Sequence, residues 1–363
     1  MIVRKRMHKP RSCEERVSCQ CRPVHKDGVT MAVSIKDIAK TAGVSPSTVS
    51  RALSDHPRIS NETKERIRRL AKEMGYTPSL LARSLVTQDT ATIGVVITSA
   101  SDPFLTHLVT SIEGVAQEQG YSVLMSSSYL DPDRELEVVG AFHGRRTRGI
   151  IVIGSQIDAG YLELRDRFPL PIVLTNCRTY PYSVYTDNLV GARRAVEHLI
   201  QLGHRRIAYI ANRRSHRSNL DRMTSYQQVL AEDGIPVKKD LIVEGDGTLQ
   251  GGNAAAKILL SRTPRPTAVF CFNDMTAIGV LSALQQADIR VPEEMSVVGF
   301  DDIEFAAYCY PPLTTVRQPT NLMGQRLVQM LLALIQGQED VDPVVLPDEL
   351  IIRESTGPPL LPA

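Results

Sequence analysis

Small polar side chains and one arginine are concentrated between positions 45 and 51 of this 363-residue chain, in the run SPSTVSR. Ser45 has the side chain of a helix N-cap, and Pro46 fits the first turn of the helix that would follow. At helical spacing, the outer face of this segment then carries four polar residues: Ser47, Thr48, Ser50 and Arg51. Hydroxyl groups and a guanidinium hydrogen-bond base edges and phosphates, so this face suits the major groove of DNA.

Two further predicted helices would hold this segment in place. Ser34 and Asp37 form a capping-box pattern at the start of one helix, and Gly43 permits a sharp turn before the next. A third helix is expected over 61–74, with Ser60 as its cap. Its outer face carries four basic residues: Lys64, Arg66, Arg68 and Lys72. The compact pattern favours a helix-turn-helix domain, and an amphipathic three-helix unit that binds protein is the alternative.

The run IAKTAGVSPSTVSR at 38–51 resembles the helix-turn-helix of the lactose-repressor family of bacterial transcription regulators. The shared pattern is an aliphatic residue, Ala, two variable residues, Ala-Gly-Val-Ser, two variable residues and Thr-Val-Ser-Arg. The resemblance implies that operator bases meet Pro46, Ser47 and Arg51. It also implies that three hydroxyl side chains lie near phosphates: Ser45, Thr48 and Ser50.

Residues 78–85, PSLLARSL, resemble the hinge helix of that family, and a hinge helix with its linker is expected over 78–90. In the family this helix orders on operator DNA, where a leucine from each subunit wedges into the minor groove. The resemblance puts Leu85 at that position. Because so short a helix is marginal in water, we expect it to order only on DNA. An ordinary linker leucine is the alternative interpretation of Leu85.

Charge is unevenly distributed along the chain, although the formal net charge is only +2. Residues 1–30 carry 8 Lys and Arg against 3 Asp and Glu, and residues 31–90 carry 10 against 6. The remaining residues carry 24 against 31. A basic N-terminal part and an acidic body are expected where one end of a protein meets phosphate groups.

Residues 1–33 are expected to be an N-terminal extension, either disordered or the result of a start assigned upstream of Met31. They lack the apolar stretch of a secretory signal, and no run of 18 apolar residues occurs elsewhere, so a cytoplasmic protein without a membrane segment is expected. The spacing of the three cysteines in this extension fits no common zinc site: Cys13, Cys19 and Cys21. No metal and no cofactor are therefore expected.

After residue 91, short apolar runs alternate with helical stretches, which is typical of parallel doubly wound sheets. The seven runs are 93–97, 121–125, 150–153, 172–174, 207–210, 268–270 and 297–300, enough for two lobes. Ligands of such folds bind at the carboxyl ends of strands. Polar residues follow several of these runs: Asp102, Asn176, Asn273, Asp274, Asp301 and Asp302.

Four segments of the body resemble the effector-binding core of the same family, which is related to periplasmic sugar-binding proteins. They are TDNLVG at 186–191, EHLIQLGHRRIAYI at 197–210, FNDMTAIGV at 272–280 and VVGFDDIEFAAY at 297–308. The resemblance puts four residues against effector hydroxyls: Asn176, Arg222, Asn273 and Asp301. Phe104 would form an apolar wall. Carboxylate, guanidinium and amide groups form paired hydrogen bonds with a polyhydroxylated ligand, which favours a sugar or sugar derivative.

Several of these residues have a plain structural alternative. Asp187 and Asp274 could cap the helices that follow them, and Asp302 could brace a turn. Arg222 could form a surface ion pair with Asp221 or with another nearby acid. Asn176 stands where many relatives have a carboxylate, so the hydroxyl pattern of the effector stays open.

Together the patterns predict a small all-α helix-turn-helix head at 34–77. They also predict, at 91–354, an α/β two-lobed core with parallel doubly wound sheets, similar to periplasmic binding proteins. A flexible tail without heptads is expected at 355–363. The resemblance implies a homodimeric repressor that binds palindromic operator DNA under the control of a sugar-like effector. The alternatives are a sugar-binding protein of transport or chemotaxis and an α/β enzyme. No catalytic residue is expected, because GxGxxG after the first strand, GxxxxGK[ST], GxSxG and HExxH are all missing.

Overall fold

The computed structural model describes residues 33–76, 90–164, 166–212, 217–338 and 340–360. The chain divides into two compact units, Met1–Ala82 and Arg83–Ala363. The predicted N-terminal extension up to residue 32 and the predicted hinge helix with Leu85 lie outside the described residues. Within the described part of the chain, no helix is long and apolar enough to cross a membrane.

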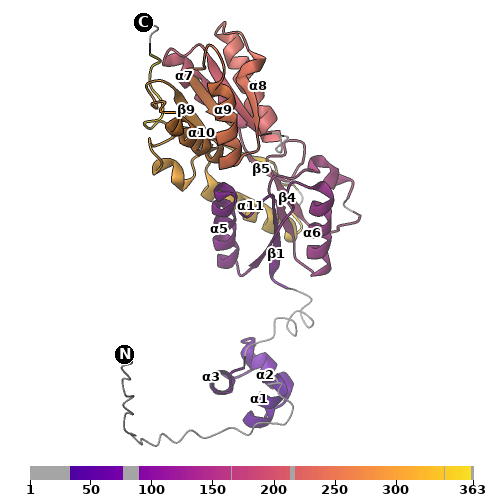
Figure 1. Cartoon of the computed structure of the whole chain (residues 1–363). Coiled ribbons are helices and arrows are strands. Elements are labelled where there is room, and N and C mark those ends of the chain that lie inside the picture. The colour runs from indigo at the N-terminus through magenta and orange to yellow at the C-terminus, as the bar shows by residue number, and fades with distance from the viewer. Residues whose placement is uncertain (1–32, 77–89, 165, 213–216, 339, 361–363) are drawn as a thin grey trace, which may run out of the picture. The chain divides into compact units, whose positions relative to one another are not determined.

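The described residues of the N-terminal unit, 33–76, contain three helices: α1 (Ile35–Ala42), α2 (Pro46–Leu53) and α3 (Asn61–Glu73) (Figure 1). The predicted capping box is confirmed, because the Ser34 side chain accepts the Asp37 backbone N–H while Asp37 Oδ2 accepts that of Ser34 at 2.9 Å. Gly43 ends α1 with a φ of 67°, where a side chain would be strained. The three helices meet over fully buried aliphatic side chains: Ile38, Val49 and Ile67.

The second unit contains two lobes, each built on a six-stranded sheet. In the first lobe the strand order is β11-β5-β4-β3-β1-β2, and the recorded pairs are all parallel. Its strands are β1 (Thr92–Ile97), β2 (Ser122–Ser127), β3 (Ile150–Val152), β4 (Ile172–Thr175), β5 (Ser183–Thr186) and β11 (Val344–Leu346). Its helices are α5 (Pro103–Glu118), α6 (Pro132–Gly144), the 3-10 helix η1 (Asp158–Leu162) and α11 (Thr320–Ile335).

In the second lobe the strand order is β12-β10-β9-β8-β6-β7, parallel except for the antiparallel edge strand β12. Its strands are β6 (Ile207–Asn212), β7 (Ile242–Gly245), β8 (Ala268–Cys271), β9 (Ser296–Asp301), β10 (Thr314–Arg317) and β12 (Glu349–Ile351). Its helices are α7 (Asn188–Gln201), α8 (Arg217–Glu232), α9 (Leu249–Leu260) and α10 (Asp274–Gln286), with the 3-10 turns η2 (Lys239–Leu241) and η3 (Glu304–Ala307).

The central strands are continuous apolar runs because helices cover both faces of each sheet. Every residue of β3, β4, β6, β8 and β9 is buried, as expected for parallel sheets covered on two sides. The predicted fold class is therefore confirmed: a helical head and a two-lobed α/β core.

The chain crosses between the two lobes three times. The first crossover, 186–188, joins β5 to α7, and the second, 317–320, joins β10 to α11. The third, 346–349, joins β11 to β12. Because α11 packs on α5, the second crossover returns the chain to the first lobe. The third crossover leads it to β12 of the second lobe.

The prediction of a flexible tail from residue 355 is wrong for its first residues. Ser355 is fully buried; its hydroxyl donates to the Val297 carbonyl at 2.6 Å and accepts the Thr314 N–H at 2.8 Å. The Gly357 carbonyl lies 2.9 Å from Nε2 of the buried His204. The tail thus packs at the start of β9 and β10, where it satisfies backbone groups that would otherwise be buried without partners.

Candidate functional site

The outer face of α2 carries the residues predicted to contact DNA. Five of the six are exposed: Ser45, Pro46, Ser47, Ser50 and Arg51. Thr48 is half-buried, and its hydroxyl lies 2.9 Å from Ser45 Oγ. Ser45 also accepts the Thr48 backbone N–H at 3.1 Å, so the predicted N-cap is confirmed. The helix therefore buries its apolar side and leaves a polar side open to a partner.

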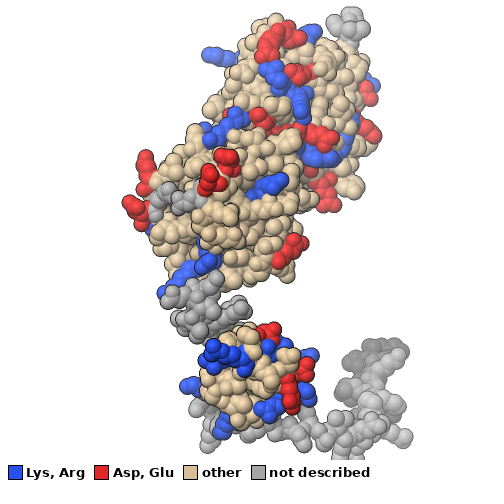
Figure 2. Space-filling view, turned by 180° about the vertical axis from the view of Figure 1, so that it is seen from behind, with Lys and Arg blue, Asp and Glu red and all other residues tan. Residues whose placement is uncertain are grey.

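The basic residues of α3 do not all lie on its outer face as predicted. Lys64 is only 8% exposed, and its Nζ lies 3.0 Å from Asp55 Oδ1. Arg68 contacts the same carboxylate at 3.0 Å, and Arg66 donates to a carbonyl of α1 at 3.2 Å. Lys64 thus braces the loop before α3. Residues 33–76 still carry 9 Lys and Arg against 5 Asp and Glu, and Figure 2 shows lysines and arginines on the visible face of this unit.

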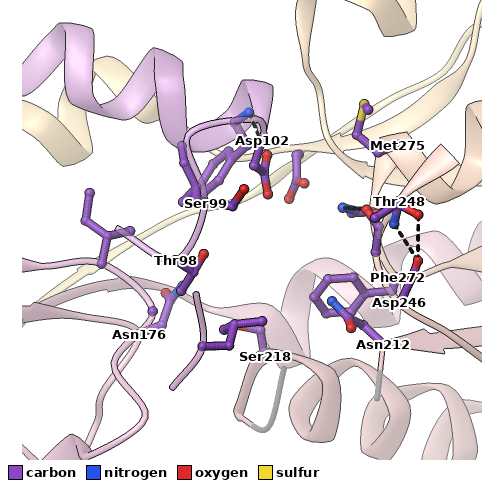
Figure 3. A pocket seen from close by; sticks show the side chains of 18 of the residues that line it. Thr98, Ser99, Asp102, Asn176, Asn212, Ser218, Asp246, Thr248, Phe272 and Met275 are labelled. Carbon is purple, nitrogen blue, oxygen red and sulfur yellow. Dashed lines mark hydrogen bonds between the residues drawn. The ribbon is translucent and has the colours of Figure 1, made fainter. Parts of the chain in front are cut away.

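A cavity of about 500 Å³ lies between the two lobes of the second unit. Its walls are loops that follow strands of both sheets, as Figure 3 shows for Thr98 and Asn176 on one side and Asn212 and Asp246 on the other. All five residues predicted to contact an effector line it: Phe104, Asn176, Arg222, Asn273 and Asp301. The carboxyl ends of the strands thus converge as the topology requires.

Arg222 lies in the wall of this cavity with only 3% of its surface exposed. Its Nε donates to Asn188 Oδ1 at 2.9 Å, Nη1 donates to the Phe272 carbonyl, and Nη2 lies 3.6 Å from Asp301 Oδ1. The guanidinium carbon lies 3.5 Å from the centroid of the Phe300 ring. The alternative of a surface ion pair with Asp221 or another nearby acid is therefore wrong, because the guanidinium is buried and pairs with the buried Asp301.

Asp301 ends β9 and is 7% exposed. Gln318 Nε2 donates to its Oδ1 at 2.7 Å. Burial raises the pKa of Asp301 well above its ordinary value, although the charge of Arg222 opposes the rise. The carboxyl of Asp274 and that of Asp102, which comes from the other lobe, raise the pKa further. Two carboxyls from opposite lobes thus face the same space.

The first lobe contributes an apolar side chain and two polar groups. Phe104 is 8% exposed and lies in the first turn of α5, whose N-cap Asp102 accepts the Phe104 N–H at 3.0 Å. Burial raises the pKa of Asp102. Asn176 follows β4, and its Oδ1 is buried without a hydrogen-bond donor among the described residues. A ligand that donates a hydrogen bond would satisfy this oxygen.

Asn273 lines the cavity, but most of its amide is used within the fold. Its Oδ1 accepts the Thr276 N–H at 3.0 Å and the Thr276 hydroxyl at 2.7 Å, and its Nδ2 donates to the Gly247 carbonyl at 3.1 Å. Asn273 is therefore the cap of α10, and the alternative that Asp274 caps this helix is wrong. Asp274 is fully buried and instead accepts the Ile303 N–H at 2.9 Å.

The two other structural alternatives are confirmed. Asp187 caps α7 by accepting the Val190 N–H at 3.4 Å. Asp302 braces a turn through ion pairs of 2.7 Å to Arg317 and Arg353. These carboxylates hold loops in place and do not line the cavity.

For several further lining residues of the cavity the sequence predicted no effector contact. Asp102 was expected only as a polar residue after the first apolar run, and three others were not singled out: Asn212, Asp246 and Gln318. A usable signal was present for Asn212 and Asp246, because each lies at or just after the carboxyl end of a strand, β6 or β7. Gln318 carried no such signal, since its role depends on a crossover between lobes.

The cavity is rich in carboxylates, and its arginines are already engaged. Four aspartates and two arginines line it: Asp102, Asp158, Asp246, Asp301, Arg217 and Arg222. Arg217 lies 2.9 Å from Asp158, which joins α8 to η1 across the two lobes. In the part of the chain that the structure describes, no group of three or more His, Cys, Asp or Glu side chains could hold a metal ion. The site thus offers hydrogen-bond acceptors more readily than free positive charge.

Comparison with known proteins covers both units. Residues 34–79 match the family described as bacterial regulatory proteins, lacI family, and residues 196–356 match the periplasmic binding protein-like domain. The HTH-type transcriptional repressor CytR of Escherichia coli (strain K12) is 35% identical over 329 residues, which cover 90% of this chain and 96% of that protein. The HTH-type transcriptional regulator RegA of Clostridium saccharobutylicum is 35% identical over 332 residues, covering 90% of this chain and 100% of that protein.

Solved structures agree with these matches. The lac repressor dimer bound to operator and the anti-inducer ONPF has a TM-score of 0.83 at 29% identity, covering 90% of this chain and 100% of that chain. The alternatives of a binding protein without a DNA role and of an enzyme are set aside, because the matched proteins are transcription regulators and the match includes the helix-turn-helix unit. The chain belongs to the LacI family of bacterial regulatory proteins and is a DNA-binding transcription regulator.

Proposed function

We propose that the protein is a homodimeric, cytoplasmic repressor whose affinity for a palindromic operator is controlled by a small polyhydroxylated metabolite. The observation that carries the proposal is the cavity between the lobes, where polar residues at the strand ends of both sheets converge. The other unit of the same chain has an exposed polar face on the helix α2. The operator-bound lac repressor dimer is a structural relative that supports the dimer and the operator.

The chemistry of the cavity supports an uncharged sugar rather than a phosphorylated one. Arg217 and Arg222 both have carboxylate neighbours, so neither is a free cation for a phosphate. Asn176 Oδ1 and the carboxyls of Asp102 and Asp301 are acceptors, which suit hydroxyl donors. Among the similar solved structures, the transcriptional regulator CelR in complex with cellobiose supports a sugar, with a TM-score of 0.67 at 30% identity, covering 89% of this chain and 99% of that chain.

On the DNA side, we infer that Pro46, Ser47 and Arg51 contact operator bases. Ser45, Thr48 and Ser50 would lie near phosphates, and Leu85 would enter the minor groove. A twofold dimer would present two copies of α2 to the two halves of an inverted repeat. The effector would change operator affinity because it binds one arrangement of the two lobes more tightly than the other.

Two measurements test the proposal. Purified protein is used to select duplexes from a random DNA library; an enriched inverted repeat, bound less tightly as salt rises, is expected. Enrichment of no inverted repeat would contradict the DNA role. In parallel, a thermal-shift screen compares neutral sugars with their phosphates, and the neutral compounds are expected to stabilise the protein more.

A matched pair of arginine variants assigns any stabilisation to the cavity. Arg222→Lys keeps the charge but loses the planar contact with Phe300, and it should lower ligand affinity at least about tenfold. Arg205→Lys is the control, because Arg205 is an exposed arginine that pairs with Asp233 outside the cavity. Ligand stabilisation that survives unchanged in Arg222→Lys would move the effector site elsewhere.

A further inference from the structure

Five buried side chains form a closed ring beside the cavity, here called the crossover ring: Thr186, Asn188, Arg222, Asp301 and Gln318. The Thr186 hydroxyl donates to Gln318 Oε1 at 2.9 Å, and Gln318 Nε2 donates to Asp301 Oδ1 at 2.7 Å. Asp301 faces Arg222 at 3.6 Å, and Arg222 donates to Asn188 Oδ1 at 2.9 Å. Asn188 Nδ2 closes the ring on the Thr186 carbonyl at 3.4 Å.

The ring connects both lobes with two of the three crossovers. Thr186 ends β5 of the first lobe, and Asp301 ends β9 of the second. Gln318 lies in the second crossover and joins these two residues through opposite ends of its amide. Thr186 and Asn188 bound the first crossover. A shift of Asp301 relative to β5 must therefore stretch one of the two hydrogen bonds of Gln318.

The ring is also part of the cavity wall. Arg222, Asp301 and Gln318 line the cavity, whereas Thr186 and Asn188 lie behind it. All five side chains are buried, with exposures of 1% to 7%. Water therefore has little access to replace a broken bond, so loss of either hydrogen bond of Gln318 leaves a buried polar group without a partner.

We propose that Gln318 is a positioning residue that links the place of Asp301 in the cavity to the angle between the lobes. A group bound at Asp301 or Arg222 would move the carboxylate, and Gln318 would pass the movement to Thr186 and so to the first crossover. The proposal rests on the proposed function only for the idea that an effector binds at Asp301.

The test needs neither operator nor effector. The chain contains no tryptophan, so Met275→Trp, at the cavity wall on α10, supplies a single fluorescent reporter. Its acrylamide quenching constant measures how open the cavity is. In this background Gln318→Leu should raise the quenching constant at least twofold, because the lobes lose the hydrogen-bonded link that Gln318 makes between Thr186 and Asp301. Gln250→Leu is the matched control, since Gln250 also lines the cavity but is exposed and outside the ring.

Double-mutant cycles distinguish coupling from simple loss of stability. Thr186→Val and Asp301→Asn weaken the two bonds of Gln318 from opposite ends, so each should raise quenching and neither should add to Gln318→Leu. Leu259→Ala, in the core of the second lobe, should lower the melting temperature without changing the quenching constant. An unchanged quenching constant in Gln318→Leu, additivity in either cycle, or an equal rise in Leu259→Ala would overturn the proposal.

The outcome is separable from that of the proposed function. If Gln318→Leu leaves the quenching constant as low as in the Met275→Trp protein, the proposed role of the crossover ring is refuted. The results of operator selection and of the ligand screen do not depend on that outcome. If no inverted repeat and no ligand are found, the regulatory function fails whatever the quenching shows.

Discussion

Asp348 is a buried carboxylate in the third crossover, and its replacement should change how stability depends on pH. The residue is 2% exposed, and neither carboxylate oxygen accepts a hydrogen bond within the described residues. The Thr186 hydroxyl lies nearby, but it donates its single proton to Gln318 and therefore not to Asp348. Burial raises the pKa of Asp348 from 3.8 to about 7, and the charge of Arg222 opposes the rise.

The sign of the effect follows from the raised pKa. Between about pH 4 and pH 7 the folded protein holds a proton on Asp348 that the unfolded chain has lost, so stability falls as pH rises through this range. The full effect of such a shift is roughly 4 kcal/mol, at 1.36 kcal/mol for each pKa unit. Part of this stabilisation is already lost when the pH has risen to about 5. Roughly 3 kcal/mol then remains to be lost between about pH 5 and pH 8.5.

Asp348→Asn removes the titration while keeping the shape of the side chain. Urea unfolding of wild type and variant between about pH 5 and pH 8.5 should show that the free energy of unfolding falls by roughly 3 kcal/mol more in wild type. Other titrating groups cancel, because both proteins contain them. Parallel pH profiles would refute the reasoning, since they would mean that Asp348 titrates alike in the folded and unfolded states.

Two further predictions concern the loop beside the cavity and the cap of α2. Glu135 is fully buried and accepts hydrogen bonds from Ser155 Oγ, the Gln156 N–H and the Tyr161 hydroxyl at 2.5, 2.9 and 2.8 Å. Glu135→Gln should lower the free energy of unfolding by about 1–3 kcal/mol, whereas the exposed Glu137→Gln should change it little; equal urea midpoints for the two would contradict this. Ser45→Ala and Ser60→Ala each remove a helix N-cap and should each cost about 1 kcal/mol by thermal unfolding. Only Ser45→Ala should also weaken binding to the selected inverted repeat in fluorescence anisotropy, and an equal loss in Ser60→Ala would show that the α2 face has no special role.

Local chemistry determined the helix ends and the general shape of the core. Ser34, Ser45 and Ser60 cap their helices as the sequence predicts, because a cap depends on residues within about four positions. The continuous apolar runs predicted buried parallel strands. Since parallel strands end at one edge of a sheet, Asn176 and Asp301 could be expected at a common site before any coordinates were known.

Only the tertiary structure decided which atoms of these residues are free and which partners they have. Arg222 pairs with Asp301 rather than with its neighbour Asp221, and the amide of Asn273 is used to cap α10. Gln318 and Asp348 had no sequence signal, because their surroundings come from crossovers far apart along the chain. Hydrogen-bond partners and pKa values depend on which groups are buried together, and burial is set by how the lobes pack, not by neighbours in sequence.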